Sequence, residues 1–212
     1  NFCFVGEFIK RKNVEALLRA YHTEFHPSEP VNLFLKLSMP GSSSEQTLQE
    51  FDKFSSAVKN GLKIRKKYRR EVAITGKLEK KHLLSLMGKS DCFVMPSIGE
   101  AWCIPALEAM ALGLPVIHTQ GTGMDDFCVG WPVQSRLTRC YLANDSLQDV
   151  YTSLTSWREI DVEALASSMR IAYETYKNDK QGWKNLKTLA IDKAQGYSIE
   201  SVGRKMKELL NV

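Results

Sequence analysis

Apolar and polar positions alternate along the first 120 residues in a way that predicts strands separated by helices. Apolar residues recur at helical spacing in four segments, 13–25, 45–62, 79–88 and 105–112, and Asn13 is the expected N-cap of the first. Between these segments lie five short apolar runs, typical of buried strands: FCFVGEF at 2–8, VNLFLKL at 31–37, EVAIT at 71–75, DCFVMP at 91–96 and PVIHT at 115–119.

This alternation predicts an α/β fold: a Rossmann-like, doubly wound parallel sheet with helices on both faces. Parallel strands end at the same edge of a sheet, which is where such folds bind ligands. We therefore expect the loops that follow Gly6, Thr75, Pro96 and Thr119 to line one edge.

Beyond residue 140 the pattern predicts helices only. We expect a single domain over residues 1–212, with a sheet core at 1–142 and a helical C-terminal extension at 143–212. The helices of that extension are predicted at 145–157, 161–178, 181–195 and 198–211.

Composition narrows the functional classes. The chain has 212 residues, 43% of them hydrophobic, and a net charge of +5, and it contains neither a membrane-length apolar run nor a signal peptide. Much of the positive charge lies in KIRKKYRR, residues 63–70. This segment is either a solvated helix end or a contact for anionic lipid or nucleic acid. The net charge falls short of that of a nucleic-acid-binding protein, so we do not expect a nucleic-acid partner. The five scattered cysteines form no metal-ligand pattern, so we interpret them as reduced thiols of a cytosolic protein.

Two helix N-termini at the expected sheet edge are candidate anion sites. Lys10, Arg11 and Lys12 precede the helix that starts near Asn13, where they are either solvated bases or, for Lys12, a phosphate ligand. The turn at 101–104, before Pro105, presents backbone N–H groups at a second N-terminus. Two converging anion sites favour a diphosphate.

Two carboxylates flank that turn. Glu100 precedes it, and Glu108 lies about one helical turn beyond its end. Both could simply interact with the helix dipole, but carboxylates beside a diphosphate cannot bind phosphate and would instead accept hydrogen bonds from sugar hydroxyls. A ribose on one flank and a hexose on the other would make the ligand a nucleotide sugar.

Three segments together resemble the C-terminal, donor-binding half of a GT-B glycosyltransferase, of the large retaining group 1 (family 4-like) class with the E-x7-E motif. They are VGEFIKRKNVEALLRA, ITGKLEKKHLLSLMGKSDCFVMPS and GEAWCIPALEAMALGLPVIHTQGTG. The resemblance implies transfer of a sugar from a UDP-, GDP- or ADP-sugar to an unknown sugar, lipid or protein acceptor, without a metal or other cofactor. It also implies an N-terminal acceptor domain, absent from this chain, without which catalysis is in doubt. We expect a cytoplasmic location, either free or peripheral to the inner face of a membrane.

The resemblance assigns roles position by position. Glu100 is the catalytic candidate that faces the donor sugar, and Glu108 would bind the ribose hydroxyls. Lys12 would bind phosphate, and Leu78 would lie against the nucleobase. The backbone of three further residues would contact sugar and diphosphate: Trp102, Cys103 and Ile104.

The sequence departs from the family pattern at some positions, and other functions are compatible with it. Glu7 stands where many members have an arginine, so one phosphate contact is either missing or supplied by Arg11. Cys103 replaces a glycine of the turn. His118 could face the sugar or be a satisfied histidine at a strand terminus. The segment GTGMDD at 121–126 could cover the donor or be an ordinary turn. A non-catalytic nucleotide-sugar-binding or scaffold module is the alternative function; an oxidoreductase is disfavoured because no GxGxxG follows the first strand.

Overall fold

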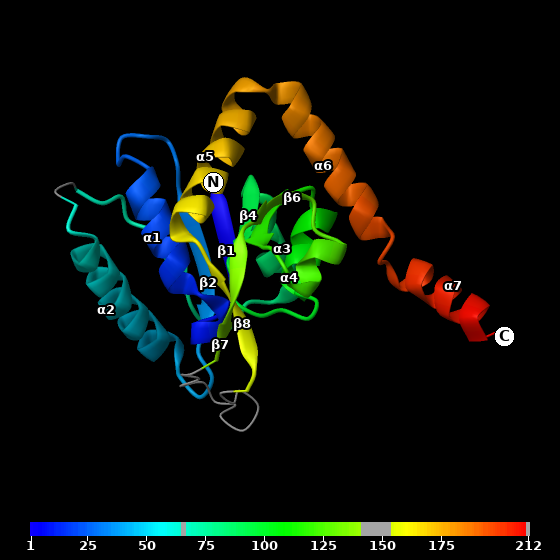
Figure 1. Cartoon of the computed structure of the whole chain (residues 1–212), viewed down its shortest axis with the longest axis horizontal. Helices are drawn as coiled ribbons and strands as arrows, with labels where there is room; N and C mark the ends of the chain where they lie inside the picture. The colour runs from blue at the N-terminus through cyan, green and yellow to red at the C-terminus, as the bar shows by residue number, and fades with distance from the viewer. Residues whose placement is uncertain (65–66, 141–153, 211–212) are drawn as a thin grey trace.

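The computed structural model describes residues 1–64, 67–140 and 154–210 and contains a parallel sheet of six strands (Figure 1). The strand order is β3-β2-β1-β4-β5-β6, and every neighbouring pair runs parallel. The strands span Phe2–Glu7 (β1), Leu33–Ser38 (β2), Val72–Ile74 (β3), Cys92–Met95 (β4), Val116–Thr119 (β5) and Gly130–Val133 (β6). The order reverses between β1 and β4, so the predicted doubly wound fold is confirmed.

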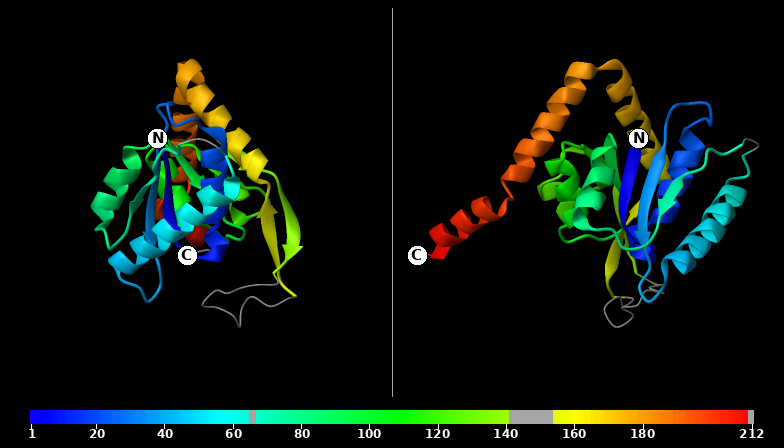
Figure 2. Two further views of the ribbon diagram at one scale, coloured as in Figure 1. Left: turned by 90° about the vertical axis from the view of Figure 1, so that its left-hand side faces the viewer. Right: turned by 180° about the vertical axis from the view of Figure 1, so that it is seen from behind.

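Helices cover both faces of the sheet (Figures 1 and 2). The helix α1 packs against α2 and α5, whereas α4 packs against α3 and α6. The bounds are Val14–Glu24 (α1), Ser44–Leu62 (α2), Lys80–Gly88 (α3), Ile104–Ala111 (α4), Val162–Asn178 (α5), Lys180–Gln195 (α6) and Ile199–Leu210 (α7). Short 3-10 turns η1 and η2 occupy Lys10–Lys12 and Gly123–Asp126.

Local signals explain why the helices start where they do. The side chain of Asn13 accepts a hydrogen bond from the N–H of Ala16, as its predicted capping role requires. Ser43 and Gln46 form a reciprocal capping box at the start of α2. The four residues of β4 are completely buried, as expected for the centre of a parallel sheet covered on both faces.

The second half of the chain differs from the sequence prediction in two ways. The sheet has a sixth strand, β6, and an antiparallel pair, β7 (Ser135–Arg139) and β8 (Ser156–Ile160), stands beside it. The prediction of a helix at 145–157 is wrong for its last two residues, because β8 begins at Ser156. Most of the predicted helix falls within residues 141–153, which lie outside the described part of the chain. The N–H of Arg158 donates to Ile98 O at 2.8 Å, so pairing with distant segments overrides the local helical pattern.

The last helix projects away from the body of the molecule in Figure 1 and in the right-hand view of Figure 2. None of the residues of α7 is buried, and its apolar side chains Ile199, Leu209 and Leu210 are 89%, 82% and 68% exposed. Across the part of the chain that the structure describes, no helix combines the length and apolar character needed to cross a membrane.

A buried carboxylate joins α1, α2 and the start of β3. Glu71 is 4% exposed and lies 3.1 Å from His22 Nε2 and 2.8 Å from Lys59 Nζ, and Ser55 Oγ donates to it. Burial alone would raise the pKa of Glu71, but hydrogen bonds with His22, Lys59 and Ser55 outweigh it and lower the pKa from 4.5 to about 2. The ionised carboxylate therefore stabilises the folded state.

Replacing this carboxylate tests its contribution. Glu71→Gln should lower the free energy of unfolding by about 3 kcal/mol at pH 7, because a pKa drop of this size is a stability contribution of that order. The contribution is complete above pH 4.5 and is lost as the pH falls towards 2, so urea unfolding of wild type and variant should converge over that range. Glu50→Gln, on the exposed face of α2, is the control, and equal stabilities at pH 7 would contradict the prediction.

Candidate functional site

Glu100 lies between two cations of the first βα connection. Its Oε1 accepts hydrogen bonds from Lys12 Nζ at 2.5 Å and from Arg11 Nη1 at 3.0 Å, and the side chains of Lys12 and Glu100 are only 11% and 8% exposed. Arg11 also donates to Gly99 O at 2.8 Å. Three of the predicted site residues thus meet in one group, which we call the ion triad. With two cations and one carboxylate, the triad carries a net charge of +1.

Backbone contacts fix the loops that carry the triad. The N–H of Ile98 donates to Arg11 O at 2.9 Å, and Ser97 Oγ donates to the same carbonyl at 3.0 Å. The side chain of Lys12 passes over Gly6, where an added Cβ would lie 3.7 Å from Lys12 Cδ and 3.0 Å from the Phe4 ring. The tight contact at Gly6 is therefore with the Phe4 ring, and the Lys12 side chain packs beside it at ordinary van der Waals distance.

The turn before α4 has the geometry expected of an anion site. The N–H groups of Ala106 and Leu107 donate back to Cys103 O, whereas the N–H groups of residues 101–104 have no protein acceptor in the described part of the chain. They lie at the positive end of the α4 dipole. Ile104 in this turn is 61% exposed.

Cys103 adopts a left-handed backbone conformation, with φ of 63° and ψ of 73°. This region suits the glycine that the resemblance leads one to expect, and a side chain there costs about 1–2 kcal/mol. The thiol is buried, and burial, reinforced by the nearby Glu100, raises its pKa to about 12. Cys103 is therefore a protonated packing group that retains the special backbone geometry of the turn.

The glycine-containing loop at 121–126, for which the sequence analysis gave two alternative roles, contacts the same turn. The N–H of Gly123, in η2, donates to Glu100 O at 3.0 Å, and a Cβ on Gly123 would lie 1.8 Å from Ala101 O. Only glycine permits this approach. The spacing of GTGMDD gave no sign of this contact, because its partner lies more than twenty residues upstream.

Trp102 and His118 use their rings for packing and support. The Trp102 ring stacks on Phe127 at 4.5 Å between centroids and meets Tyr197 edge-on. His118 Nε2 lies 3.0 Å from Asp125 Oδ1, and burial lowers the pKa of His118, which keeps it neutral at pH 7. The second oxygen of Asp125 accepts the N–H of Gly121. His118 is thus paired within the loop through Nε2, whereas its buried Nδ1 has no hydrogen-bond partner among the described residues, so the expectation of a satisfied histidine is met at one ring nitrogen only.

The remaining two predicted site residues, Glu108 and Leu78, lie near the start of α3. Glu108 pairs with Lys80, the first residue of α3, which the sequence analysis did not single out. Leu78, two residues earlier, lines a cavity of about 670 Å³ together with Gly6 and Glu7. The cavity joins the carboxyl ends of β1, β2 and β3, and its volume lies within the range of small-molecule sites.

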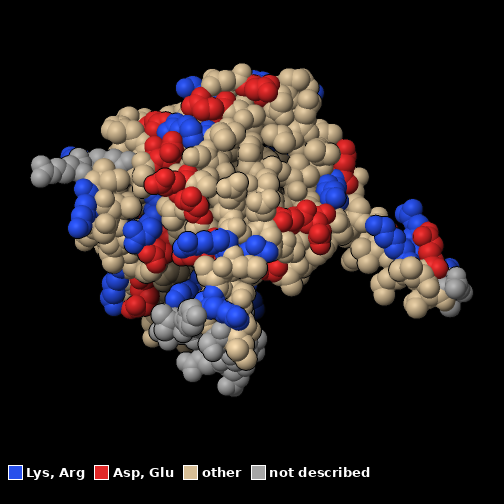
Figure 3. Space-filling view, viewed as in Figure 1, with Lys and Arg blue, Asp and Glu red and all other residues tan. Residues whose placement is uncertain are grey.

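The surface around the site is mixed in charge. Lys and Arg side chains gather towards the lower edge of Figure 3, on the side where β1 ends. The described residues contain no group of three or more His, Cys, Asp or Glu side chains arranged to hold a metal ion.

Known proteins resemble the chain in sequence. The family model of the group 1 glycosyl transferases matches residues 1–146. A serotype-specific mannosyltransferase, WbdA of Escherichia coli, is 27% identical over 188 residues, which cover 86% of this chain and 20% of the relative. The chain thus spans about a fifth of the length of this relative.

Solved structures resemble it in fold. The C-terminal domain of a glycosyl transferase group 1 family protein, LpcC of Francisella tularensis, has a TM-score of 0.64 and 16% identity, with 93% of this chain and 86% of that chain covered. The pneumococcal O-GlcNAc transferase GtfA, solved with UDP and GlcNAc, has a TM-score of 0.61 and 15% identity, with 99% of this chain and 35% of that chain covered.

The fold is therefore the Rossmann-like half of a GT-B glycosyltransferase. Because the family model covers more than two thirds of the chain, from the first strand to beyond the β7 strand, this protein belongs to the group 1 family of glycosyl transferases.

Proposed function

We propose that this chain binds a nucleotide-diphosphate sugar and supplies the donor half of a retaining glycosyltransferase. The observation that carries the proposal is the ion triad of Arg11, Lys12 and Glu100, directly before the N-terminus of α4. A UDP complex of the similar pneumococcal enzyme supports a nucleotide as the ligand. The base and sugar of the donor, and the acceptor, stay open.

Charge assigns the diphosphate to the cationic side of this group. Lys12, Arg11 and the N–H groups of residues 101–104 would bind the phosphates and stabilise the negative charge that develops as the diphosphate leaves. The excess positive charge of the triad favours an anion even while Glu100 is paired. Protein cations thus take the role that a metal ion plays in other transferases, and we propose that this enzyme needs none.

The two carboxylates would take the hydroxyls of the donor. Glu100, held by two bases, would accept hydrogen bonds from the sugar near its reacting carbon, and Glu108 would exchange Lys80 for the ribose hydroxyls. Leu78 would then lie against the base in the 670 Å³ cavity. Retention follows from the resemblance: the leaving phosphate itself would help to deprotonate an acceptor that attacks from the same face.

The wider setting belongs to the same proposal. We infer a cytoplasmic enzyme, supported by five free thiols, that works with an acceptor-binding domain. The acceptor domain is inferred from structures such as GtfA, of which this chain covers about a third.

Nucleotide titration tests the donor site. UDP, GDP or ADP should bind the wild type, and Lys12→Met should weaken binding by about tenfold to a hundredfold, the effect of one charge-assisted hydrogen bond. Glu108→Ala should weaken it by about tenfold through lost ribose contacts. Lys53→Met, an exposed lysine of α2, is the control for Lys12 in calorimetric titrations. Failure of all three nucleotides to bind would refute the donor site.

Chelation tests the proposed role of the bases. Excess EDTA should leave nucleotide affinity unchanged, because Arg11, Lys12 and the α4 dipole neutralise the diphosphate. The same titration with magnesium or manganese added back is the comparison. A strict requirement for either ion would contradict this prediction.

Gly123→Ala tests the loop that supports the turn. The added Cβ would overlap Ala101 O, so the turn must shift, and we expect a loss of about 1–3 kcal/mol in stability together with weaker nucleotide binding. Gly61→Ala, in α2 with nothing within 4 Å of the added Cβ, should be neutral or stabilising. Unchanged nucleotide affinity in a folded Gly123→Ala variant would rule out this role.

A further inference from the structure

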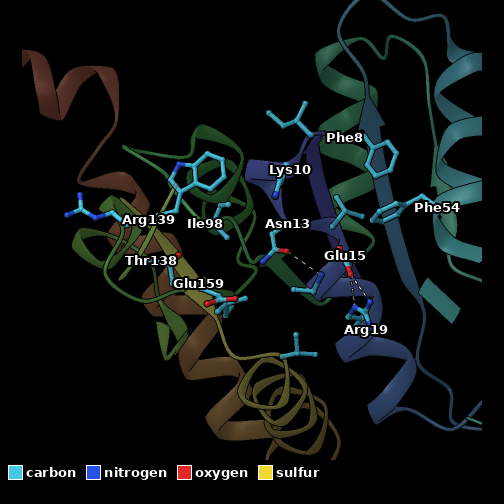
Figure 4. Close-up of a pocket in the computed structure, with 16 residues that line it drawn as sticks. Phe8, Lys10, Asn13, Glu15, Arg19, Phe54, Ile98, Thr138, Arg139 and Glu159 are labelled. Carbon is cyan, nitrogen blue, oxygen red and sulfur yellow. Dashed lines mark hydrogen bonds and ion pairs between the residues drawn. The ribbon is translucent and has the colours of Figure 1, made fainter. Parts of the chain in front are cut away.

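A cavity of about 660 Å³ lies beside the ion triad and is separate from the predicted donor contacts. One wall is formed by Phe8 and Asn13 of the β1–α1 segment and by Phe54 of α2, and the other by Ile98, the β7–β8 pair and the start of α5 (Figure 4). None of Glu100, Lys12 and Glu108 lines it. Its volume lies within the range of about 300–1,000 Å³ that small-molecule sites occupy.

Two short segments, residues 10–12 and 98–100, contribute both to this cavity and to the triad. Ile98 faces the cavity, and Glu100, two residues later, binds Lys12 on the other side. Gly99 between them lies against Trp157, since a Cβ at Gly99 would be 3.7 Å from the indole. Likewise Lys10 lines the cavity while Lys12 belongs to the triad. The cavity therefore borders both segments that carry the triad.

The lining combines aromatic rings with polar groups. Phe8 and Phe54 pack edge to face at 5.1 Å, and Trp157 lies on the β8 side. The partial negative charge on an aromatic face attracts the C–H groups of a sugar ring.

Polar groups line the same cavity: in Figure 4 Asn13 lies between the two walls, and Glu159 lies across from Phe8 and Phe54. Glu159 receives both of its bonds from Arg136 on Oε2, which leaves Oε1 as a further acceptor. Asn13 caps α1 with its oxygen, which leaves its amide NH2 as a donor. A cavity that combines hydrogen-bond acceptors and donors with aromatic rings suits the hydroxyls and C–H faces of a carbohydrate better than it suits an alkyl chain.

We propose that this cavity is the subsite for an acceptor saccharide, which packs against the rings of Phe8 and Phe54 and hydrogen-bonds to Glu159 and Asn13. The inference rests on the proposed function, because it takes the donor to lie at the triad. It names a carbohydrate as the acceptor class and places part of its recognition on the donor-binding half.

Saturation-transfer NMR tests the subsite, with α-1,2-mannobiose and maltose as probes and 1-octanol as the alkyl comparison. Thr138→Trp fills the cavity from β7, whereas Leu137→Trp adds the same ring at the neighbouring position, which is 62% exposed and does not line the cavity. We expect a disaccharide signal in the wild type and in Leu137→Trp that is lost in Thr138→Trp. Nucleotide titration should give the same affinity in all three proteins.

A second variant keeps the test decisive if Thr138→Trp does not fold. Glu159→Leu should reduce the disaccharide signal and strengthen the octanol signal, because it replaces a carboxylate acceptor by an apolar group. Octanol binding without disaccharide binding, or a disaccharide signal that ignores both variants, would overturn the inference.

The two proposals can fail separately. Nucleotide binding that depends on Lys12, without any disaccharide signal, would refute the subsite and leave the donor site standing. A disaccharide signal that is sensitive to Thr138→Trp in a protein that binds no nucleotide would refute the donor site alone.

Discussion

The burial of Glu100 against Lys12 and Arg11 is the constraint on which the architecture of the site depends. A carboxylate that is 8% exposed would cost several kcal/mol without its partners, so the loops after β1 and β4 must hold these side chains within hydrogen-bond distance. The bonds from Ile98 and Ser97 to Arg11 O join the same two loops through the backbone. The sheet supports this arrangement, because β1 and β4 are neighbours at the point where the strand order reverses.

Sequence periodicity was sufficient for the elements up to Thr119 because their signals are strong and local. Apolar runs such as DCFVMP and capping residues such as Asn13 agree with the tertiary structure, and the strands lie within about two residues of their predicted bounds. GWPV, the sixth strand, contains both Gly130 and Pro132, residues that argue against a strand unless a neighbour supplies the pairing. That neighbour is β5, whose position cannot be read from local sequence.

The candidate site divides in the same way. That Lys12, Glu100, Glu108 and Leu78 share one edge follows from the parallel topology, whereas the direct pairing of Lys12 with Glu100 spans 88 residues and depends on side-chain geometry. The left-handed conformation of Cys103 could be expected from the glycine it replaces. The support from Gly123 and the pairing of Glu108 with Lys80 had no signal in spacing, because each joins segments that meet only in the folded chain.

Both glutamates of the site are paired with bases before any ligand is present, and this pairing resolves an electrostatic conflict. Two unpaired carboxylates at a diphosphate site would repel the ligand, with an energy that grows as water is excluded. Glu100 together with Lys12 and Arg11 forms a group whose net charge is +1, and the Glu108–Lys80 pair is neutral. On the proposed function, an arriving donor would exchange one base contact for a hydroxyl at each carboxylate while its phosphates use the freed cations. The carboxylates would then recognise hydroxyls without opposing the binding of the diphosphate.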